Sequence, residues 1–275
     1  MRAFRTTLMT ALCFIVLVTT AFAGTPKAPK APKSAMICPT ETVQAGSLCV
    51  DRYEASVWSV PATNTSLLAR VKAGAVTLAD LTAGGATQMG AAMDACTGNE
   101  YPAEFPRNGN WTAPLFALSI PGVPPSACIS WYQATQACAL SGKRLLRNEE
   151  WQLAAAGTPD PGLTDDGVAQ CNVAGTMAAS TGARTLCVSS WLAADMIGNL
   201  AEWTATWDEN ADGCSDLTGE FGGGEQCFGG DPGGNRVFGL VRGGSYLSEE
   251  KASTFTLWTF SLETQSREIG FRCGR

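Results

Sequence analysis

The cysteines constrain the fold of this chain more than any other residue type. The sequence of 275 residues contains 11 cysteines, and one of them, Cys13, falls in an apolar N-terminal segment. The remaining cysteines are even in number, which in an oxidising compartment indicates a disulfide framework. Spacing alone leaves the connectivity open, but four local pairs are plausible and leave one long-range pair: Cys38–Cys49, Cys96–Cys128, Cys171–Cys187, Cys214–Cys227 and Cys138–Cys273. Because Gly (30 residues) and Trp (8 residues) are also abundant, we expect a loop-rich fold of short strands linked by disulfides.

The N-terminus has the features of a secretory signal peptide. Arg2 and Arg5 give a positive start, residues 8–18 are apolar, and residues 21–23 read Ala-Phe-Ala, a typical cleavage site. The apolar segment is too short to span a bilayer comfortably, and no later segment is long and apolar enough. The sequence therefore predicts a secreted or periplasmic protein without a membrane span, in which residues 1–23 are removed. Residues 24–35, rich in Pro, Lys and Ala, are expected to be a linker, and residues 36–275 a single domain.

The charge balance argues against a nucleic-acid partner. The whole chain has a net charge of −6, from 19 Lys and Arg against 25 Asp and Glu. Removal of residues 1–23 takes away two arginines and no acids, so 17 basic side chains would face 25 acidic ones, a net of −8. Phosphate contacts need basic patches, so we expect no nucleic acid to bind.

The absence of histidine excludes several kinds of catalytic site. The chain contains no His, so neither a Ser-His-Asp triad nor a Cys-His pair can form. Sites in which His binds zinc or non-haem iron are excluded for the same reason. Any acid–base chemistry would depend on carboxylates, Lys, Tyr or Cys.

Local patterns predict two helices in the middle of the chain. Ser130 and Gln133 have the spacing of a capping box, which predicts a helix from Trp131 to about Leu140. A second helix is expected to begin near Asn148 and to end at Gly157, with Trp151, Leu153 and Ala154 facing the core. Elsewhere we expect helical structure within residues 67–81, loops over 84–125, a strand over 49–57, a long excursion over 208–235, and closing strands over 237–246 and 270–275.

Four segments carry a resemblance to a known family. They are YEAS at residues 53–56, a block from CISW at 128–131 through GKRL at 142–145 to EW at 150–151, DMIGNLAEW at 195–203, and RGGSY at 242–246 together with GFRC at 270–273. In this order and spacing they resemble the formylglycine-generating enzyme family, also called the sulfatase-modifying factor family. The resemblance implies an α+β fold, a single C-type-lectin-like domain over about residues 45–275, and supports the Cys138–Cys273 pair.

The resemblance also implies calcium sites. In the family, the segment that corresponds to Gly198, Asn199, Leu200 and Glu202 binds calcium through backbone carbonyls and a carboxylate, the hard oxygen ligands that this ion prefers. The alternative is a Glu satisfied by backbone N–H groups. A second family site would use Asn172, but the downstream acid of that site is missing between residues 173 and 194.

The catalytic cysteine pair of the family is missing from this chain. In the family two cysteines after the RGGS motif bind copper and engage the substrate, and their positions correspond here to Ser248 and Ser253, while Ser245 is retained. A hydroxyl is a poor ligand for Cu(I), which prefers soft sulfur, so no copper is expected. We therefore expect a binding or structural module that uses the former active-site face for an unknown peptide, protein or glycan. The alternative is an enzyme of the same family with displaced or altered catalytic residues, which a reactive free thiol would reveal.

The segment that follows this pair allows two interpretations. Residues 253–267 contain Phe255, Trp258 and Phe260 among small polar residues, a mixture that suits recognition. The same residues also fit a core strand with one solvated face. Trp131, Trp151 and Trp203 are similarly ambiguous between a sugar site and the core, and their spacing favours the core.

Overall fold

A computed structural model describes residues 36–91, 95–109, 111–208 and 238–275. The predicted signal peptide, the linker, the Cys214–Cys227 pair and most of the predicted excursion over 208–235 lie outside these residues. The elements in chain order are β1 (Thr42–Ala45), β2 (Leu48–Asp51), β3 (Ser56–Ser59), α1 (Thr65–Ala73), α2 (Leu78–Ala83), β4 (Thr87–Met89), β5 (Leu115–Leu118), α3 (Trp131–Leu140), β6 (Arg144–Leu145), α4 (Asn148–Ala155), β7 (Ala201–Asp208), β8 (Phe238–Arg242), a short 3₁₀ turn (Glu249–Lys251), β9 (Leu257–Ser261), β10 (Ile269–Phe271) and β11 (Cys273–Gly274). In the described part of the chain, no helix has the length and apolarity required to cross a bilayer.

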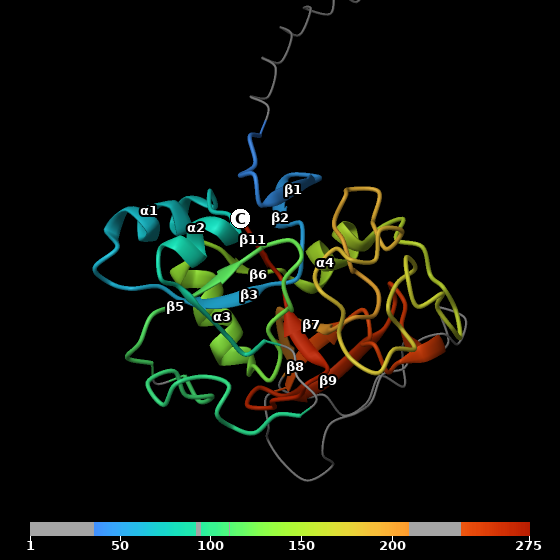
Figure 1. Ribbon diagram of the computed structural model, residues 1–275. Coiled ribbons are helices and arrows are strands. Elements are labelled where there is room, and N and C mark those ends of the chain that lie inside the picture. Colours follow the sequence, from blue (N-terminus) through green and yellow to red (C-terminus); the bar gives the residue numbers. More distant parts are fainter. Residues whose placement is uncertain (1–35, 92–94, 110, 209–237) are drawn as a thin grey trace, which may run out of the picture. The chain divides into compact units, whose positions relative to one another are not determined.

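Three small sheets make up the β structure of this part of the chain. The first has the order β1-β2-β11-β6 and places the C-terminal strand between two strands from earlier in the sequence. The second has the order β10-β7-β8-β9, in which β10 runs parallel to β7 and the other pairs are antiparallel (Figure 1). The third has the order β4-β3-β5. Short strands in several sheets, joined by long irregular segments, confirm the predicted loop-rich α+β class.

The strand predicted over residues 49–57 is two strands in different sheets. β2 ends at Asp51 and β3 begins at Ser56, and the residues between them turn from one sheet to the other. The half-buried alternation expected over this segment is absent, because Glu54, Ala55 and Ser56 are all fully buried. The predicted closing strand over 237–246 is also shorter, since Gly243 and Gly244 adopt positive φ values of 87° and 78° after β8.

The two predicted central helices are present. Ser130 caps α3 through its hydroxyl, which accepts from the backbone N–H of Gln133, and the Gln133 side chain accepts from the Ser130 N–H. α4 spans Asn148–Ala155 and buries Trp151 and Ala154, but Leu153 is 41% exposed, so its predicted core position is wrong. Leu153 lies two positions from Trp151, which turns its side chain about 200° away around a helix.

The four predicted disulfides that fall in the described residues are all present. They are Cys38–Cys49, Cys96–Cys128, Cys138–Cys273 and Cys171–Cys187. The Cys138–Cys273 bond joins α3 to β11 and lies in the main hydrophobic core with Trp203 and Phe271. Trp151 and Trp203 are buried, so the core interpretation of these two tryptophans is confirmed.

Candidate binding face around Ser245

Ser245 and Ser248 form a small buried hydroxyl network directly after β8. The Ser245 Oγ donates to Glu268 Oε2 at 2.9 Å, and the two serine Oγ atoms lie 3.3 Å apart. The backbone N–H of Ser245 donates to Ser248 Oγ at 2.8 Å. Ser245 is fully buried and Ser248 is 5% exposed. These hydroxyls therefore close a turn and have oxygen and nitrogen partners at the position where the family resemblance places a thiol.

Ser253 belongs to a different turn. Its hydroxyl accepts from the Phe255 backbone N–H at 3.1 Å and lies 3.2 Å from the Thr256 hydroxyl. The structure thus brings Ser245 and Ser248 together, whereas Ser253 is hydrogen-bonded within its own segment. Glu268 was not singled out from the sequence, although its place two residues before the GFRC motif could have marked it.

Strand β9 supplies an aromatic edge next to these turns. All five of its residues are half-buried, so the alternation expected of a core strand is absent. Phe260 packs edge-to-face against the buried Trp203, with ring centroids 6.4 Å apart, while Phe255 is 56% exposed and Leu247 is 43% exposed. In the second sheet β9 pairs only with β8 among the described strands. This edge combines anchored and exposed aromatic surface.

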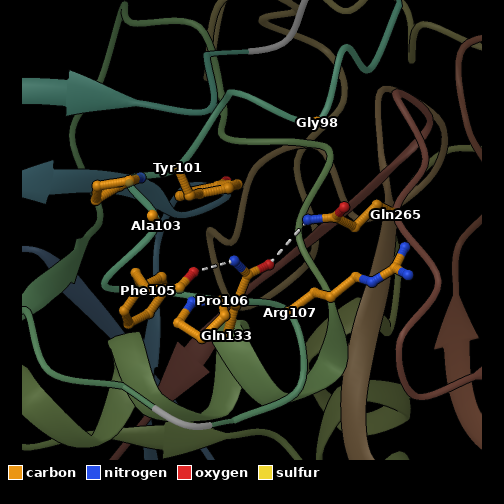
Figure 2. A pocket seen from close by; sticks show the side chains of 9 residues that line it. Gly98, Tyr101, Ala103, Phe105, Pro106, Arg107, Gln133 and Gln265 are labelled. Carbon is orange, nitrogen blue, oxygen red and sulfur yellow. Dashed lines mark hydrogen bonds between the residues drawn. The ribbon is translucent and has the colours of Figure 1, made fainter.

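A pocket of about 290 Å³ lies mainly on the segment between β4 and β5, and Gln133 of α3 and Gln265 from the β9–β10 connection complete its lining. Figure 2 shows the rings of Tyr101 and Phe105 on one side and the side chains of Gln265 and Arg107 on the other. Gln133 forms the base: its Nε2 donates to the Phe105 carbonyl at 2.6 Å, and its Oε1 accepts from Gln265 Nε2 at 3.1 Å. Other lining residues are Gly98, Pro102, Ala103 and Pro106.

This pocket adjoins the serine network through the chain itself. Gln265 lines the pocket and Glu268, three residues later, accepts from Ser245. The backbone of this segment is anchored, because the Ser266 carbonyl accepts from the Cys128 N–H at 2.9 Å. We refer to the serine turns, the β9 edge and this pocket together as the serine face.

The predicted calcium segment contains a buried ion pair. Glu202 is 1% exposed, and its Oε1 lies 2.7 Å from Arg272 Nη2, while its Oε2 accepts from Trp151 Nε1 at 2.7 Å. Asn199, at φ 56°, uses its side chain to bridge Asn172, Ala179 and Glu54. Glu202 would therefore have to share its carboxylate between Arg272 and an ion.

The charges around this ion pair do not balance. Glu54, Asp195 and Glu202 are all buried, with Arg272 as their common cation. Burial raises the pKa of Asp195 to about 6, and burial together with the Asp195 and Glu202 charges raises the pKa of Glu54 well above its usual value. A proton or a cation would offset this surplus of negative charge. Even so, no three Asp, Glu, Cys or His side chains within the described residues are arranged to hold a metal ion.

Asn172 does not fit a cation. Its Oδ1 accepts from Arg184 Nη2 at 3.2 Å, and Arg184 Nη1 lies 3.6 Å from Asp165 Oδ1. The Arg184 guanidinium is therefore already hydrogen-bonded to the Asn172 side-chain oxygen that would have to bind a metal ion. Neither Arg184 nor Asp165 was recognised from the sequence, since the sequence does not show that their loops meet.

The arrangement defines an α+β domain whose candidate site lies on loops and on the edge strand β9. The family model for the sulfatase-modifying factor enzyme 1-like domain matches residues 118–275, more than half of the chain. The chain belongs to this family, which agrees with the α+β, C-type-lectin-like class expected from the sequence. No curated protein matches the sequence.

Several solved structures are similar in fold. The U1 variant of the major tropism determinant is 19% identical with a TM-score of 0.44, and the match covers 87% of this chain and 53% of that one. CarF is 16% identical with a TM-score of 0.41 (85% and 92% covered), and PvdO from Pseudomonas aeruginosa is 17% identical with a TM-score of 0.40 (83% and 80% covered). This chain spans about half the length of the tropism determinants that it matches.

Proposed function

We propose that this protein is an exported, non-oxidase member of the sulfatase-modifying factor family that binds a peptide or protein segment through the serine face. The observation that carries the proposal is the buried network of Ser245, Ser248 and Glu268. Hard oxygen groups that are hydrogen-bonded to one another suit neither Cu(I) nor a mixed disulfide with a substrate cysteine. All eight cysteines in the described parts of the chain form disulfides, so none of them supplies a replacement thiol.

The pocket and the β9 edge support binding rather than chemistry. Pro102, Ala103 and Pro106 give the pocket an apolar wall for a ligand side chain. The Gln265 amide and the Arg107 guanidinium can orient a peptide group or an acidic side chain. Exposed Phe255 and Leu247 extend the apolar surface beyond the pocket. Aromatic anchors next to adaptable amides are typical of recognition surfaces.

Calcium remains part of the proposal at one site only. The backbone carbonyls of Gly198 and Leu200 and the carboxylate of Glu202 would hold the ion, and the surplus negative charge of the buried cluster supports this. The bound ion would offset that charge and stabilise the loop that precedes β7. No calcium is proposed at Asn172.

A Cu(I) titration of the mature protein, with a cysteine-containing peptide and oxygen, tests the non-oxidase proposal. We expect neither tight copper binding nor peptide oxidation in the unmodified protein. The matched control is the S248C/S253C double variant, which places thiols at both positions and is expected to bind Cu(I) kept reduced by ascorbate, a reductant that leaves the structural disulfides closed. Peptide oxidation by the unmodified protein would refute the proposal.

An enzyme with altered chemistry is the second candidate. The Ser245 hydroxyl donates to the Glu268 carboxylate, which is the one contact on this face that could activate a nucleophile. A fluorophosphonate probe would label an activated serine. Labelling that Glu268→Gln abolishes would favour the enzyme, whereas no labelling favours the binding module.

A further inference from the structure

A second pocket lies away from the residues of the serine face. It has a volume of about 290 Å³ and shares no lining residue with the pocket of Figure 2. Four chain segments form it: the residues before β1, the turn after β2, the residues at the start of α2, and the residues after β5. Its lining residues are Thr40, Glu41, Arg52, Tyr53, Val76, Thr77, Leu78, Ser119, Ile120 and Pro121.

In the described part of the chain, Arg52 has a buried side-chain donor without a partner in this pocket. Its Nε is buried and has no hydrogen-bond partner among the described residues. Its backbone, in contrast, is firmly held: the N–H donates to the Glu41 carbonyl at 3.0 Å, and the carbonyl accepts from Arg272 Nη1 at 2.9 Å and from the Ala194 N–H at 2.8 Å. Among the described residues, the Nε of Arg52 is therefore a buried donor without a partner at the wall of the pocket. Because burying an unpaired donor is unfavourable, an anion bound by this guanidinium would offset that cost.

The acidic residue of the pocket is paired with cations that lie outside it. The Glu41 carboxylate is 3.2 Å from Lys143 Nζ, which it shares with Asp51. It is also 3.6 Å from Arg275 Nη2, and its Oε2 accepts from the Ser119 N–H at 3.5 Å. Ser119, which is 2% exposed, accepts from the Tyr53 N–H at 3.0 Å and keeps its own hydroxyl proton for donation. The pocket thus offers a guanidinium and a hydroxyl donor.

The other lining residues of the pocket favour a ligand with an apolar part. Val76 and Ile120 are buried apolar residues, Pro121 lies beside them, and Leu78 at the rim is 41% exposed. A volume near 300 Å³ is at the small end of ligand pockets and accommodates about one or two amino-acid residues. An inorganic oxyanion would leave these apolar walls unfilled.

From these observations we propose that the Arg52 pocket binds a carboxylate that carries a short apolar body, with the planar guanidinium and the Ser119 hydroxyl as donors. Guanidinium and carboxylate match in a bidentate geometry, whereas Lys would act only as a point charge. Two sources share this chemistry: the C-terminal residue of a peptide and a free aliphatic acid.

Calorimetric titration of the mature protein with four probes tests the proposal. The probes are a tetrapeptide ending in leucine with a free C-terminal carboxylate, the same peptide as its C-terminal amide, 4-methylpentanoate, and sulfate. We expect the peptide acid or 4-methylpentanoate to bind, and the stronger of the two identifies the source. Equal binding of the peptide acid and its amide, binding of sulfate alone, or no binding of either carboxylate would overturn the proposal.

Substitutions make the site assignment falsifiable. Arg52→Gln is expected to weaken carboxylate binding at least about tenfold, because a hydrogen bond to a charged group is lost. Arg147→Gln, at an exposed position that lines neither pocket, changes the net charge equally and is the matched control. Leu78→Glu, at the exposed rim, is expected to abolish binding by charge repulsion without disturbing the core. Undiminished binding in both folded pocket variants would refute the site.

Discussion

Removing the Cys138–Cys273 disulfide is expected to destabilise the domain more than removing any shorter one. The bond closes a segment of 135 residues, and the loop-entropy relation gives about 5 kcal/mol for a loop of this length. The Cys171–Cys187 bond closes 16 residues, for which the same relation gives about 3 kcal/mol. The expected difference between the two is therefore about 2 kcal/mol.

The two disulfides form a matched pair for this measurement. Cys138 and Cys273 are fully buried, and Cys171 and Cys187 are 1% and 0% exposed, so their double Ala variants lose similar buried surface. Double substitution avoids stranding a free thiol that could exchange with the remaining disulfides.

Urea unfolding under oxidising conditions gives the free energy of unfolding of each variant by linear extrapolation. The C138A/C273A variant should also show a larger m value, because its unfolded chain exposes more surface. If C171A/C187A proved equally or more destabilised, the loop-length argument would be wrong. Peptide mapping that paired Cys138 with a residue other than Cys273 would remove its basis.

Three further predictions concern single residues. Burial raises the pKa of Asp51 from its ordinary 3.8 to about 6 despite its contact with Lys143. Between about pH 4 and 6 the folded state therefore keeps a proton that the unfolded state has released, so stability falls as the pH rises through this range. Asp51→Asn should flatten this dependence of the melting temperature on pH. Gly198→Ala should destabilise by about 1–3 kcal/mol, measured by urea unfolding, because φ is 71° and an added Cβ meets the Asn172 carbonyl; wild-type stability would contradict this. If calcium binds at Glu202, EDTA should lower the melting temperature of the unmodified protein and leave that of Glu202→Gln unchanged, whereas no effect of EDTA would remove the calcium proposal.

The sequence predicts best where structure depends on neighbours along the chain. The capping box of Ser130 and Gln133 needs only a spacing of three residues, and α3 begins where it predicts. The disulfide pairs could be predicted from the sequence, because each cysteine was expected to have a partner and most partners are close in sequence. The alternation of polar and apolar residues over 49–57 predicted one strand, but the chain turns between β2 and β3, and Glu54 is buried although it is polar.

The candidate sites depend on contacts between distant segments, which no local pattern reports. Gln133 and Gln265 are 132 residues apart and meet at the base of one pocket. The hydrogen bond of Ser245 with Glu268 joins two loops that are distant in sequence, one in the RGGSY motif and one just before the GFRC motif. The unpaired Nε of Arg52 becomes visible only when burial and partners are known together.

The position of β11 has a consequence for biosynthesis. Because Cys273 and Gly274 pair with Leu145, Arg144 and Val50, the first sheet stays open in the middle until residue 274 has left the ribosome. The β1-β2 hairpin is synthesised more than 200 residues before β11, which pairs with β2 in the same sheet. The first sheet therefore completes its pairing only after residue 274 has emerged from the ribosome. Deleting residues 273–275 should therefore prevent folding, because it removes the β11 pairings and the Cys138–Cys273 disulfide.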